Sequence, residues 1–375
     1  MLEIERGRPK GPDHMRGERH SRQPREMGFV RNLTLSLGAN KSDIFVPESI
    51  ISRFKLRQGV VISGSAANGN GKGLEAKNID MVNGVNPDEW KTIAEFSQHE
   101  AVSPSEMIRL EGPASDPAMR IVDLFCPLGK GQRALIVSPP KAGKTILMQQ
   151  IAHAVSQNNP DVELIVLLID ERPEEVTDMR RSVRGEVFAS SNDNDLSSHV
   201  RLAQLVPEYA KRKVETGKDV VLLLDSLTRL GRAFNVHQKS SGRTMSGGVD
   251  IRALEVPKRI FGAARKFEGA GSLTIIATIL VDTNSRMDEL IFQEFKGTGN
   301  MELVLERNLA NERIFPAINL GVSGTRREEL LFGESLREHQ ELRRSIARMS
   351  PREAMQNVLK LIHRYPTNEK LLSNF

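Results

Sequence analysis

Cysteine, aromatic residues and long apolar runs are all scarce in this sequence of 375 residues. The single cysteine, Cys126, excludes an internal disulfide framework and is typical of a reducing compartment. The longest apolar run, near Leu273–Val281, is far shorter than a membrane span, and the N-terminus lacks the apolar core of a signal peptide. These absences indicate a cytoplasmic protein without a membrane partner.

The composition is otherwise that of an ordinary globular protein. Hydrophobic residues make up 39% and charged residues 27% of the chain, so most of it is able to bury a core. The length suits two or three domains. The formal net charge of +5 is compatible with an anionic partner such as a nucleic acid, and equally with a basic protein that has no such partner.

Residues 1–26 form a polar, arginine-rich segment, which predicts a disordered tail. Prolines interrupt its arginines, and very little of it is apolar. A solvated tail is one interpretation of this segment. The other is that it samples the phosphates of RNA or DNA electrostatically.

Residues 27–84 contain short apolar runs separated by turn signals, a pattern that predicts a small all-β barrel. One short helix is expected between its strands, at Glu48–Phe54. Residues 85–118 are polar and contain prolines, so we interpret them as a linker. The expected strands of the barrel lie at Gly28–Val30, Ile44–Val46, Val60–Ile62 and Ile79–Val82.

From residue 119 to residue 375 the pattern becomes α/β. Continuous apolar runs alternate with segments of helical periodicity, which predicts a parallel sheet covered by helices on both faces. The part from Arg327 onward is expected to be helical, and Pro366 ends its last amphipathic stretch. The predicted strands are Ala134–Val137, Glu163–Ile169, Val220–Leu224 and Leu273–Val281, and the predicted helices include Thr145–Val155 and His199–Val214.

A phosphate-binding loop follows the first of these strands and opens a helix, which is the context that such a loop requires. Its backbone N–H groups point at the phosphates, Lys144 reaches the β- and γ-phosphates, and Thr145 offers its hydroxyl to Mg²⁺. Ser138 replaces the glycine that is usual at the first position, ahead of two prolines that restrict the turn. The residues predicted to bind ATP here are Ser138, Pro139, Lys141, Ala142, Gly143, Lys144, Thr145 and Ile146.

Two acidic residues at strand ends complete the predicted chemistry. Asp225 ends the strand Val220–Leu224, where a carboxylate is the expected second partner of Mg²⁺, directly or through a water. Glu171 follows Glu163–Ile169 at the edge where ligands bind in parallel sheets, and it is placed to deprotonate the attacking water. Its rivals for this role are Asp170, Glu174 and Glu175, although the last two suit the first turn of a helix that starts at Pro173.

Two polar loops that follow strands are candidates for contact with a nucleic acid. The loop His237–Gly248 contains Arg243 and Thr244, and the loop Asp282–Arg286 contains Ser285. Each loop carries one arginine that is able to hold a phosphate. The alternative is that both are flexible surface loops.

The barrel offers a second surface of this kind. Phe29 and Phe45 lie on two of its strands and could form a platform on which bases stack, with Arg31 supplying charge. The alternative is that both phenylalanines belong to the core, and these residues alone do not decide between the two.

Six separated motifs together resemble the Rho family of bacterial transcription termination factors. They occur in order within a region that runs from Met27 to the C-terminal helices, so the resemblance covers nearly the whole chain. They are PPKAGKT within Ser138–Thr145, ERPEEVTD at Glu171–Asp178, LDSLTR at Leu224–Arg229, SGRTMSGGVD at Ser241–Asp250, FKGTGNME at Phe295–Glu302 and SGTR at Ser323–Arg326.

The resemblance implies a RecA-like P-loop ATPase domain, preceded by an OB-fold barrel of the cold-shock type. It implies a homohexamer that binds nascent single-stranded RNA, hydrolyses ATP with Mg²⁺ and translocates in the 5′ to 3′ direction. Such a motor unwinds RNA–DNA hybrid and releases the transcript from RNA polymerase.

The resemblance also implies roles for single residues. Glu171 would be the catalytic base and Asp225 the carboxylate associated with Mg²⁺, while Arg326 resembles an arginine finger that reaches the ATP of a neighbouring subunit. Phe315 resembles the residue that stacks on adenine, and the two polar loops resemble the RNA-gripping loops. Lys141, Lys144 and Thr145 would contact phosphates and Mg²⁺, and Arg172, Arg229 and Arg232 resemble coupling and sensing residues.

The sequence departs from the family pattern at its nucleic-acid surfaces. Met27 stands at a position that is typically aromatic in the family, and a methionine stacks on a base less well than a ring does. Arg243 and Arg286 stand where lysine is common, so the charge is kept but the shape of the cation differs.

Two other functions share some of these features. A rotary or export ATPase has the same core fold and P-loop, but it lacks the phenylalanine strands of the barrel and the SGRTMSGG loop. A nucleic-acid-binding module with ATP as a structural switch would not need a positioned base such as Glu171. The sequence therefore favours an RNA-dependent ATPase and helicase.

Overall fold

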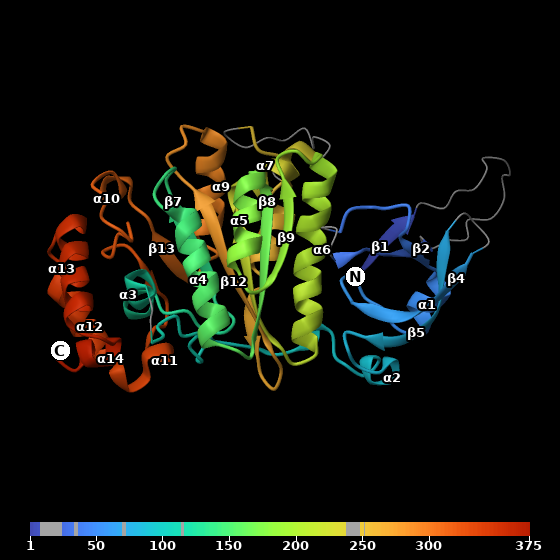
Figure 1. The fold of residues 1–375 in the computed structure, drawn as a ribbon, viewed down its shortest axis with the longest axis horizontal. Coiled ribbons are helices and arrows are strands. Elements are labelled where there is room, and N and C mark those ends of the chain that lie inside the picture. Colours follow the sequence, from blue (N-terminus) through green and yellow to red (C-terminus); the bar gives the residue numbers. More distant parts are fainter. Residues whose placement is uncertain (8–24, 34–36, 70–72, 114–115, 238–247, 251) are drawn as a thin grey trace. The chain divides into compact units, whose positions relative to one another are not determined.

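A computed structural model of the chain describes residues 1–7, 25–33, 37–69, 73–113, 116–237, 248–250 and 252–375 (Figure 1). The described residues group into two compact units. The first comprises Met1–Gln98 together with Gln204–Thr216, and the second comprises His99–Ala203 together with Gly217–Phe375.

The first unit is built on a sheet of five strands in the order β1-β2-β3-β5-β4 among the described residues. Strand β1 pairs antiparallel with β2, and at its start Leu2 also exchanges backbone hydrogen bonds with Gly59 and Val60, just ahead of β4. The sheet therefore curls toward closure, as the predicted barrel requires. Its elements are β1 Leu2–Gly7, β2 Arg25–Val30, β3 Ile44–Val46, α1 Glu48–Arg53, β4 Ile62–Asn68, β5 Leu74–Val82 and α2 Pro87–Trp90.

For residues 2–7, strand β1 corrects the prediction of a disordered tail over residues 1–26. Leu2 is fully buried in the core of this unit and Ile4 packs against that core, whereas Glu3 and Glu5 alternate with them. This alternation has the period of a strand, but only four residues show it before the arginine-rich segment begins, which hides it in the sequence. Residues 8–24 of the predicted tail lie outside the described residues.

The second unit contains the predicted parallel sheet. Strands β13, β7, β12, β10, β8 and β9 are parallel neighbours in that order, and β14 adds an antiparallel edge. The four predicted strands are confirmed as β7 Arg133–Ser138, β8 Val162–Glu171, β10 Asp219–Asp225 and β12 Ser272–Leu280. The remaining strands are β6 Ala101–Val102, β9 Glu186–Ser191, β11 Arg265–Phe267, β13 Met301–Val304 and β14 Gly324–Thr325.

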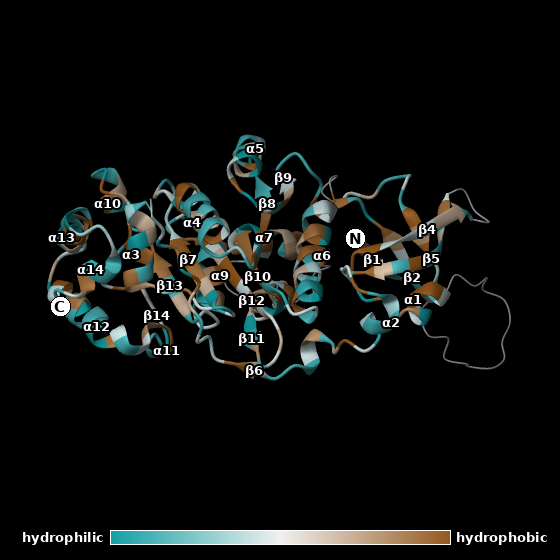
Figure 2. Cartoon of the chain, turned by 60° about the horizontal axis from the view of Figure 1, so that its bottom comes forward, coloured by the Kyte–Doolittle hydropathy of each residue, from teal (hydrophilic) through white to brown (hydrophobic). Residues whose placement is uncertain are grey.

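Helices cover this sheet because its strands are apolar on both faces. Nearly every residue of β10 and β12 is buried, whichever face it points to, and these strands are brown in Figure 2. The helices that begin in this unit are α3 Pro117–Phe125, α4 Lys144–Asn158, α5 Pro173–Ser182, α6 Leu196–Glu215, α7 Leu227–His237, α8 Glu255–Phe261, α9 Arg286–Lys296, α10 Arg307–Asn311, α11 Glu329–Phe332, α12 Leu336–Ile346, α13 Pro351–Arg364 and α14 Asn368–Leu372.

The helix boundaries follow from local capping chemistry. Helix α13 starts with a capping box, in which the Ser350 hydroxyl accepts from the Glu353 N–H and Glu353 reaches back to Ser350. Its end at Arg364 lies just before Pro366, as predicted. The predicted helices over 145–155 and 199–214 are confirmed as parts of α4 and α6.

The segment 85–118, predicted to be a linker, contributes elements to both units. Trp90 of α2 is buried in the core of the first unit, and its indole N–H donates to the Lys55 carbonyl. Strand β6 pairs antiparallel with β11 in the second unit. The segment is therefore anchored at both ends.

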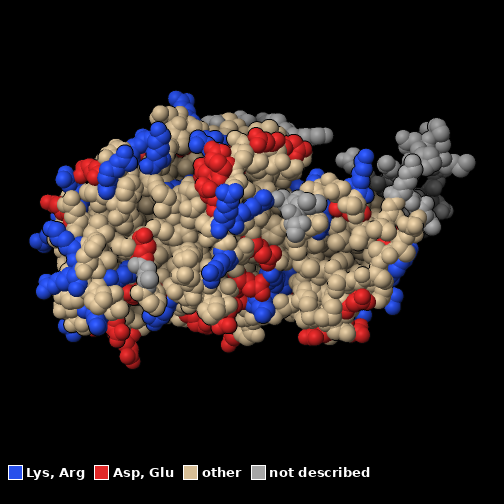
Figure 3. Space-filling view, viewed as in Figure 1, with Lys and Arg blue, Asp and Glu red and all other residues tan. Residues whose placement is uncertain are grey.

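The surface carries charges of both signs, and Figure 3 shows basic and acidic side chains spread over the visible face. In the part of the chain that the structure describes, no helix is both long enough and apolar enough to cross a membrane.

Candidate active site

The loop between β7 and α4 has the backbone geometry of a phosphate cradle. Lys141 and Gly143 both adopt positive φ angles, of 65° and 90°, and Gly143 is the N-cap residue directly before α4. The first turn of α4 therefore directs its free N–H groups into the space in front of the loop. Ser138 is fully buried and its hydroxyl donates to the Pro139 carbonyl, so it shapes the turn.

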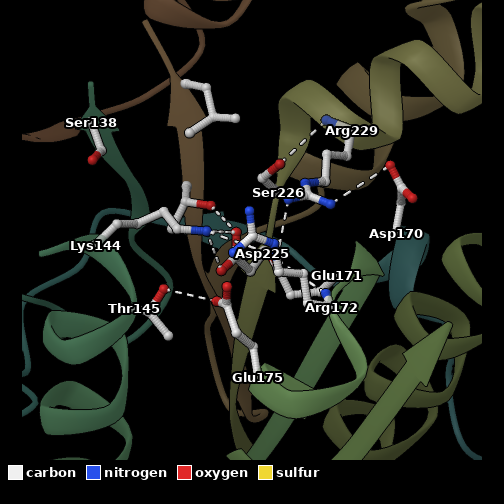
Figure 4. Close-up of polar contacts among 12 residues, drawn as sticks. Ser138, Lys144, Thr145, Asp170, Glu171, Arg172, Glu175, Asp225, Ser226 and Arg229 are labelled. Carbon is white, nitrogen blue, oxygen red and sulfur yellow. Dashed lines mark hydrogen bonds and ion pairs between the residues drawn. The ribbon is translucent and has the colours of Figure 1, made fainter. Parts of the chain in front are cut away.

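Lys144 and Asp225 form the centre of the site, where Figure 4 shows them pointing toward each other from α4 and the end of β10. The Lys144 Nζ atom lies 2.6 Å from both carboxylate oxygens of Asp225. The Thr278 hydroxyl of β12 also donates to Asp225, at 2.7 Å. Because the strands are parallel, their carboxyl ends meet at this edge and bring distant residues together.

Glu171 lies beside this pair and is almost completely buried. One of its oxygens accepts from Arg229 Nη2 at 3.1 Å, while the other, Oε2, is 3.6 Å from Lys144 Nζ. Within the described residues, Oε2 is buried without a hydrogen-bond partner. Burial raises the pKa of Glu171 above its usual range and the charge of Asp225 adds to this, whereas Lys144 and Arg229 oppose it.

A β-bulge turns Glu171 into the site. The pairing of β8 with β9 shifts between Ile169 and Glu171, and the residue between them, Asp170, has a φ angle of 56°. Asp170 stays partly exposed, 3.7 Å from Arg229 Nη1. Glu174 is exposed in the first turn of α5, as predicted. Among the four acidic candidates for the base, Glu171 alone is buried beside Lys144.

Glu175 makes a contact that sequence reasoning missed. It lies in the first turn of α5, and its carboxylate accepts a hydrogen bond from the Thr145 hydroxyl at 3.1 Å. Three carboxylates, those of Asp225, Glu171 and Glu175, thus surround Lys144 and Thr145. Their combined negative charge suits a bound cation. The two consecutive acidic residues after Pro173 were the sequence signal that could have pointed to Glu175.

A cavity of about 430 Å³ opens beside the P-loop helix. Phe315 lines it and is 47% exposed, and its ring comes within 3.7 Å of where a Cβ on Gly143 would be. Ile146 lines the same cavity and is 62% exposed. The structure therefore places both residues, predicted from the sequence to contact the nucleotide, at one apolar pocket. Lys141 is exposed within the P-loop, and Arg172 is exposed directly before α5.

Helix α7 carries two arginines that reach in different directions. Arg229 contacts Glu171, whereas Arg232 donates to Asp288 of α9 at 2.8 Å. Asp288 is buried and also accepts from the Thr283 hydroxyl at 2.6 Å. The loop Asp282–Arg286 is thereby connected to α7, the helix whose Arg229 contacts Glu171. The sequence did not reveal this connection.

The loop Asp282–Arg286 presents the features expected of a contact surface. Asp282 and Asn284 have positive φ angles, Ser285 caps α9, and Arg286 is exposed. The other predicted RNA loop cannot be compared in this way, since Arg243 and Thr244 lie outside the described residues.

Arg326 lies away from the P-loop of its own chain. It follows β14, and its backbone N–H donates to Asn300 at the amino end of β13, whereas the P-loop follows the carboxyl end of the parallel strand β7. Arg326 is exposed and forms no ion pair with any described residue. Glu329, one of its two possible partners, pairs with Arg327 instead. The ion pair considered as an alternative for Arg326 is therefore not formed.

The two phenylalanines of the barrel pair outside its core. Phe29 and Phe45 are direct partners in the β2–β3 ladder, and their ring centroids are 5.8 Å apart in an edge-to-face arrangement. Both are only partly buried, whereas the neighbouring Gly28 and Val46 face inward. Met27 is also partly exposed. These contacts favour the platform over the core interpretation.

Arg31, which the sequence predicted to supply charge to this surface, is already paired with acidic side chains. It is buried, and it forms ion pairs with Glu3 at 2.6 Å, Glu5 at 3.3 Å and Asp43. Its guanidinium also lies 5.0 Å from the centroid of the Phe29 ring. Three carboxylates already neutralise its charge. Arg31 therefore supports the Phe29 ring and does not offer an unpaired charge to a ligand.

Comparison with known proteins gives two family matches. The profile of the ATP synthase alpha/beta family, nucleotide-binding domain, matches residues 118–325. The profile of the Rho termination factor, RNA-binding domain, matches residues 22–88.

Similar proteins of known name decide the family. Transcription termination factor Rho of Pseudomonas aeruginosa is 48% identical over 353 residues, which cover 92% of this chain and 84% of that protein. Rho of Neisseria gonorrhoeae is 52% identical over 313 residues, covering 82% and 75% of the two chains. The chain belongs to the Rho family of transcription termination factors. It is an RNA-binding ATPase of that family.

Solved structures of export ATPases share the fold. A prototypical ATPase from the type III secretion system of pathogenic bacteria superposes with a TM-score of 0.59 at 22% identity, covering 73% of this chain and 85% of that chain. The assembled type III secretion ATPase EscN of enteropathogenic E. coli gives 0.58 at 22% identity, covering 73% and 71%. At this identity the similarity concerns the fold alone. The much higher identity to the Rho relatives favours the Rho family over an export ATPase.

Proposed function

We propose that this chain is one subunit of a homohexameric motor that hydrolyses ATP and moves along nascent RNA in the 5′ to 3′ direction. The motor separates RNA–DNA hybrid and releases the transcript from RNA polymerase. The observation that carries the ring is the position of Arg326. It lies at the amino end of the parallel strands, whereas the P-loop lies at their carboxyl end, so it serves a neighbouring subunit and not its own.

Within one site, each side chain has a task. Lys144 releases Asp225 and binds the β- and γ-phosphates, while Glu171 accepts a proton from the attacking water through Oε2, which accepts no hydrogen bond from any described residue. The raised pKa of Glu171 makes its carboxylate a stronger base for this step. Arg326 of a neighbour stabilises the charge that develops on the transferred phosphoryl group.

The acidic surroundings of Lys144 and Thr145 also fit Mg²⁺. The Thr145 hydroxyl and the Asp225 carboxylate would hold the ion, which supplies positive charge to the phosphate oxygens when bound. Among the described residues no group of three metal-binding side chains is preassembled. A site that completes its coordination with substrate phosphates and water does not need one.

RNA binding is assigned to two surfaces. The first unit presents Phe29, Phe45 and Met27 as a stacking platform for bases. In the second unit RNA binding is assigned to the loop Asp282–Arg286 and to the loop that contains Arg243 and Thr244, two residues that lie outside the described ranges. The link from Asp288 to Arg232 supports communication between that surface and the ATP site.

The assembly claim is tested by how the specific ATPase activity depends on protein concentration. The full chain is diluted in the presence of Mg²⁺ and single-stranded RNA, and its mass is followed by light scattering. We expect six subunits per particle and a specific activity that falls as the particles dissociate. A monomer that hydrolyses ATP at an undiminished rate would contradict the proposal.

A further inference from the structure

The turn 320–323, which lies shortly before Arg326, contains backbone carbonyls that require hydrogen-bond partners. Leu320 and Ser323, at its two ends, are both buried, and a buried carbonyl without a partner is costly. Strand β14, which separates this turn from Arg326, has only two residues. So short a strand fixes the direction of the residue that follows it only weakly. The orientation of Arg326 therefore depends on what anchors the turn 320–323.

Arg343 of helix α12 supplies this anchor. Its Nη1 atom donates to the Ser323 carbonyl at 3.0 Å and to the Leu320 carbonyl at 3.4 Å. Its Nη2 atom donates to the Phe125 carbonyl, at the end of helix α3. A guanidinium carries five N–H donors in one rigid plane. A single side chain thus joins both ends of the turn to a neighbouring helix.

The surroundings of Arg343 keep its guanidinium against the turn. A Cβ atom on Gly324 would lie 3.7 Å from Nη2, and the centroid of the Phe125 ring is 5.4 Å from the central guanidinium carbon. The ion pair of Arg343 with Glu328 spans 4.0 Å, which is longer than each of its hydrogen bonds to backbone carbonyls. The closest contacts of this cation therefore go to the backbone of the turn and of α3, and not to a carboxylate.

We propose that Arg343 is the positioning residue of Arg326. Its hydrogen bonds hold the turn 320–323, and through the short strand β14 they set the direction in which Arg326 projects toward the ATP of a neighbouring subunit. Arg326 and Arg343 border the same open cavity, of about 870 Å³. This inference rests on the proposed role of Arg326. Since an arginine finger acts on the transition state, its correct placement governs the maximal rate and not the affinity for ATP.

Arg343→Lys tests the hydrogen bonds apart from the charge, because lysine keeps a cation but replaces the planar fork by a compact ammonium. The maximal ATPase rate of assembled particles, measured with Mg²⁺ and single-stranded RNA, should fall roughly 10- to 100-fold, since a displacement of about 1 Å is enough for such a loss. The KM for ATP should stay within about twofold of the wild-type value. Arg344→Lys is the matched control and should keep the wild-type rate, because Arg344 is exposed and forms no ion pair with any described residue.

Mixed particles test whether Arg343 acts on the site of a neighbouring subunit. Arg343→Lys subunits keep an intact P-loop, whereas Lys144→Ala subunits keep an intact Arg343 and Arg326. In a one-to-one mixture, about a quarter of the head-to-tail interfaces join the P-loop of the first kind to the Arg326 of the second. Particles that contain both kinds are isolated through two different affinity tags. They should hydrolyse ATP several-fold faster than particles of either variant alone.

The same mixture prepared with Arg326→Ala in place of Arg343→Lys is the reference. If Arg343→Lys does not assemble, Arg343→Gln takes its place, since its amide keeps one donor for the Ser323 carbonyl. The positioning role of Arg343 is wrong if only the Arg326→Ala mixture gains activity, or if Arg343→Lys alone matches Arg344→Lys, and the proposed function then stands. If neither mixture gains activity, the proposed action of Arg326 in a neighbouring site is itself refuted.

Discussion

Glu171, Lys144 and Asp225 are more than twenty residues apart in the sequence, and each is ordinary in isolation. They become a candidate catalytic group because three strand or helix ends converge and bring them together. Burial of two carboxylates next to one ammonium is costly for a fold, and it is retained where charge is needed for chemistry. The burial of Glu171 beside Lys144 and Asp225 leads to the first prediction.

Glu171→Gln should lower the maximal ATPase rate by about 10²–10⁴-fold, because it removes general-base catalysis while keeping the shape of the side chain. Nucleotide binding should be largely preserved. Glu174→Gln, an exposed neighbour in the same segment, serves as the control and should behave as the wild type. Steady-state kinetics and a binding titration check this, and a normal rate in the Glu171 variant would return the base role to another acid.

Phe29→Ala should weaken binding of single-stranded RNA by about 1–3 kcal/mol, the usual contribution of one stacked base. The reason is that Phe29 is only partly buried and forms an edge-to-face pair with Phe45. Met81→Ala removes another exposed apolar side chain of the same unit and should have little effect. Fluorescence anisotropy with labelled RNA measures both, and equal affinities for the two variants would show that Phe29 is not part of a platform.

The P-loop and the candidate residues Glu171 and Asp225 could be located from the sequence because each lies at the end of a recognisable apolar strand. Glu175 and Asp288 could not be assigned their partners, since their contacts with Thr145 and Arg232 depend on how two helices dock. The burial of Arg31 was hidden for a similar reason, because its partners Glu3 and Glu5 lie on a strand that the sequence did not reveal.

At the scale of elements, the long apolar strands were predictable and the short or polar ones were not. Strands β8 and β12 are continuous apolar runs, whereas β9 ends in Ala189-Ser190-Ser191 and β13 has only four residues. Such strands are defined by their neighbours in the sheet more than by their own pattern. The segment before α3 illustrates the same point.

Helix α3 holds that segment through Asp123, which accepts backbone hydrogen bonds from Leu110 and Glu111. Burial raises the pKa of Asp123 to about 7 from an ordinary value of 3.8. Between these pH values the folded chain binds one proton more than the unfolded chain does. The stabilisation is therefore complete below pH 3.8 and is lost as the pH rises through about 7.

Asp123→Asn should remove this dependence. Relative to the variant, the wild type should lose up to roughly 4 kcal/mol of unfolding free energy between pH 4 and pH 8. Denaturant titrations at several pH values measure it, with the exposed Asp178→Asn as the control. Parallel pH profiles for wild type and Asp123→Asn would show that Asp123 is ionised throughout in the folded chain.

At the scale of the whole molecule, the chain combines a unit with a proposed base-stacking surface and a unit with a candidate ATP site, and we propose that Arg326 acts in the ATP site of a neighbouring subunit. Arg326 is exposed at the amino end of the sheet and has no acidic partner among the described residues, which is how a group that serves another subunit is expected to look. The resemblance of six motifs to one family was enough to predict this arrangement, but not the geometry that explains it.

Arg326→Ala should reduce ATP hydrolysis by about 10³–10⁵-fold without weakening nucleotide binding, because an arginine finger acts on the transition state. Arg327→Ala, next in the chain and paired with Glu329, should retain most of the activity. Rates and affinities measured on assembled particles of both variants check this. A normal rate for Arg326→Ala would exclude the finger.

The central claim is that RNA controls ATP hydrolysis in this chain. The most direct test is the steady-state ATPase rate of the full chain with Mg²⁺, measured without nucleic acid, with single-stranded RNA and with single-stranded DNA of the same sequence. The account predicts strong stimulation by RNA and little by DNA. Equal rates under the three conditions would contradict it, because hydrolysis would then proceed without regard to the polymer.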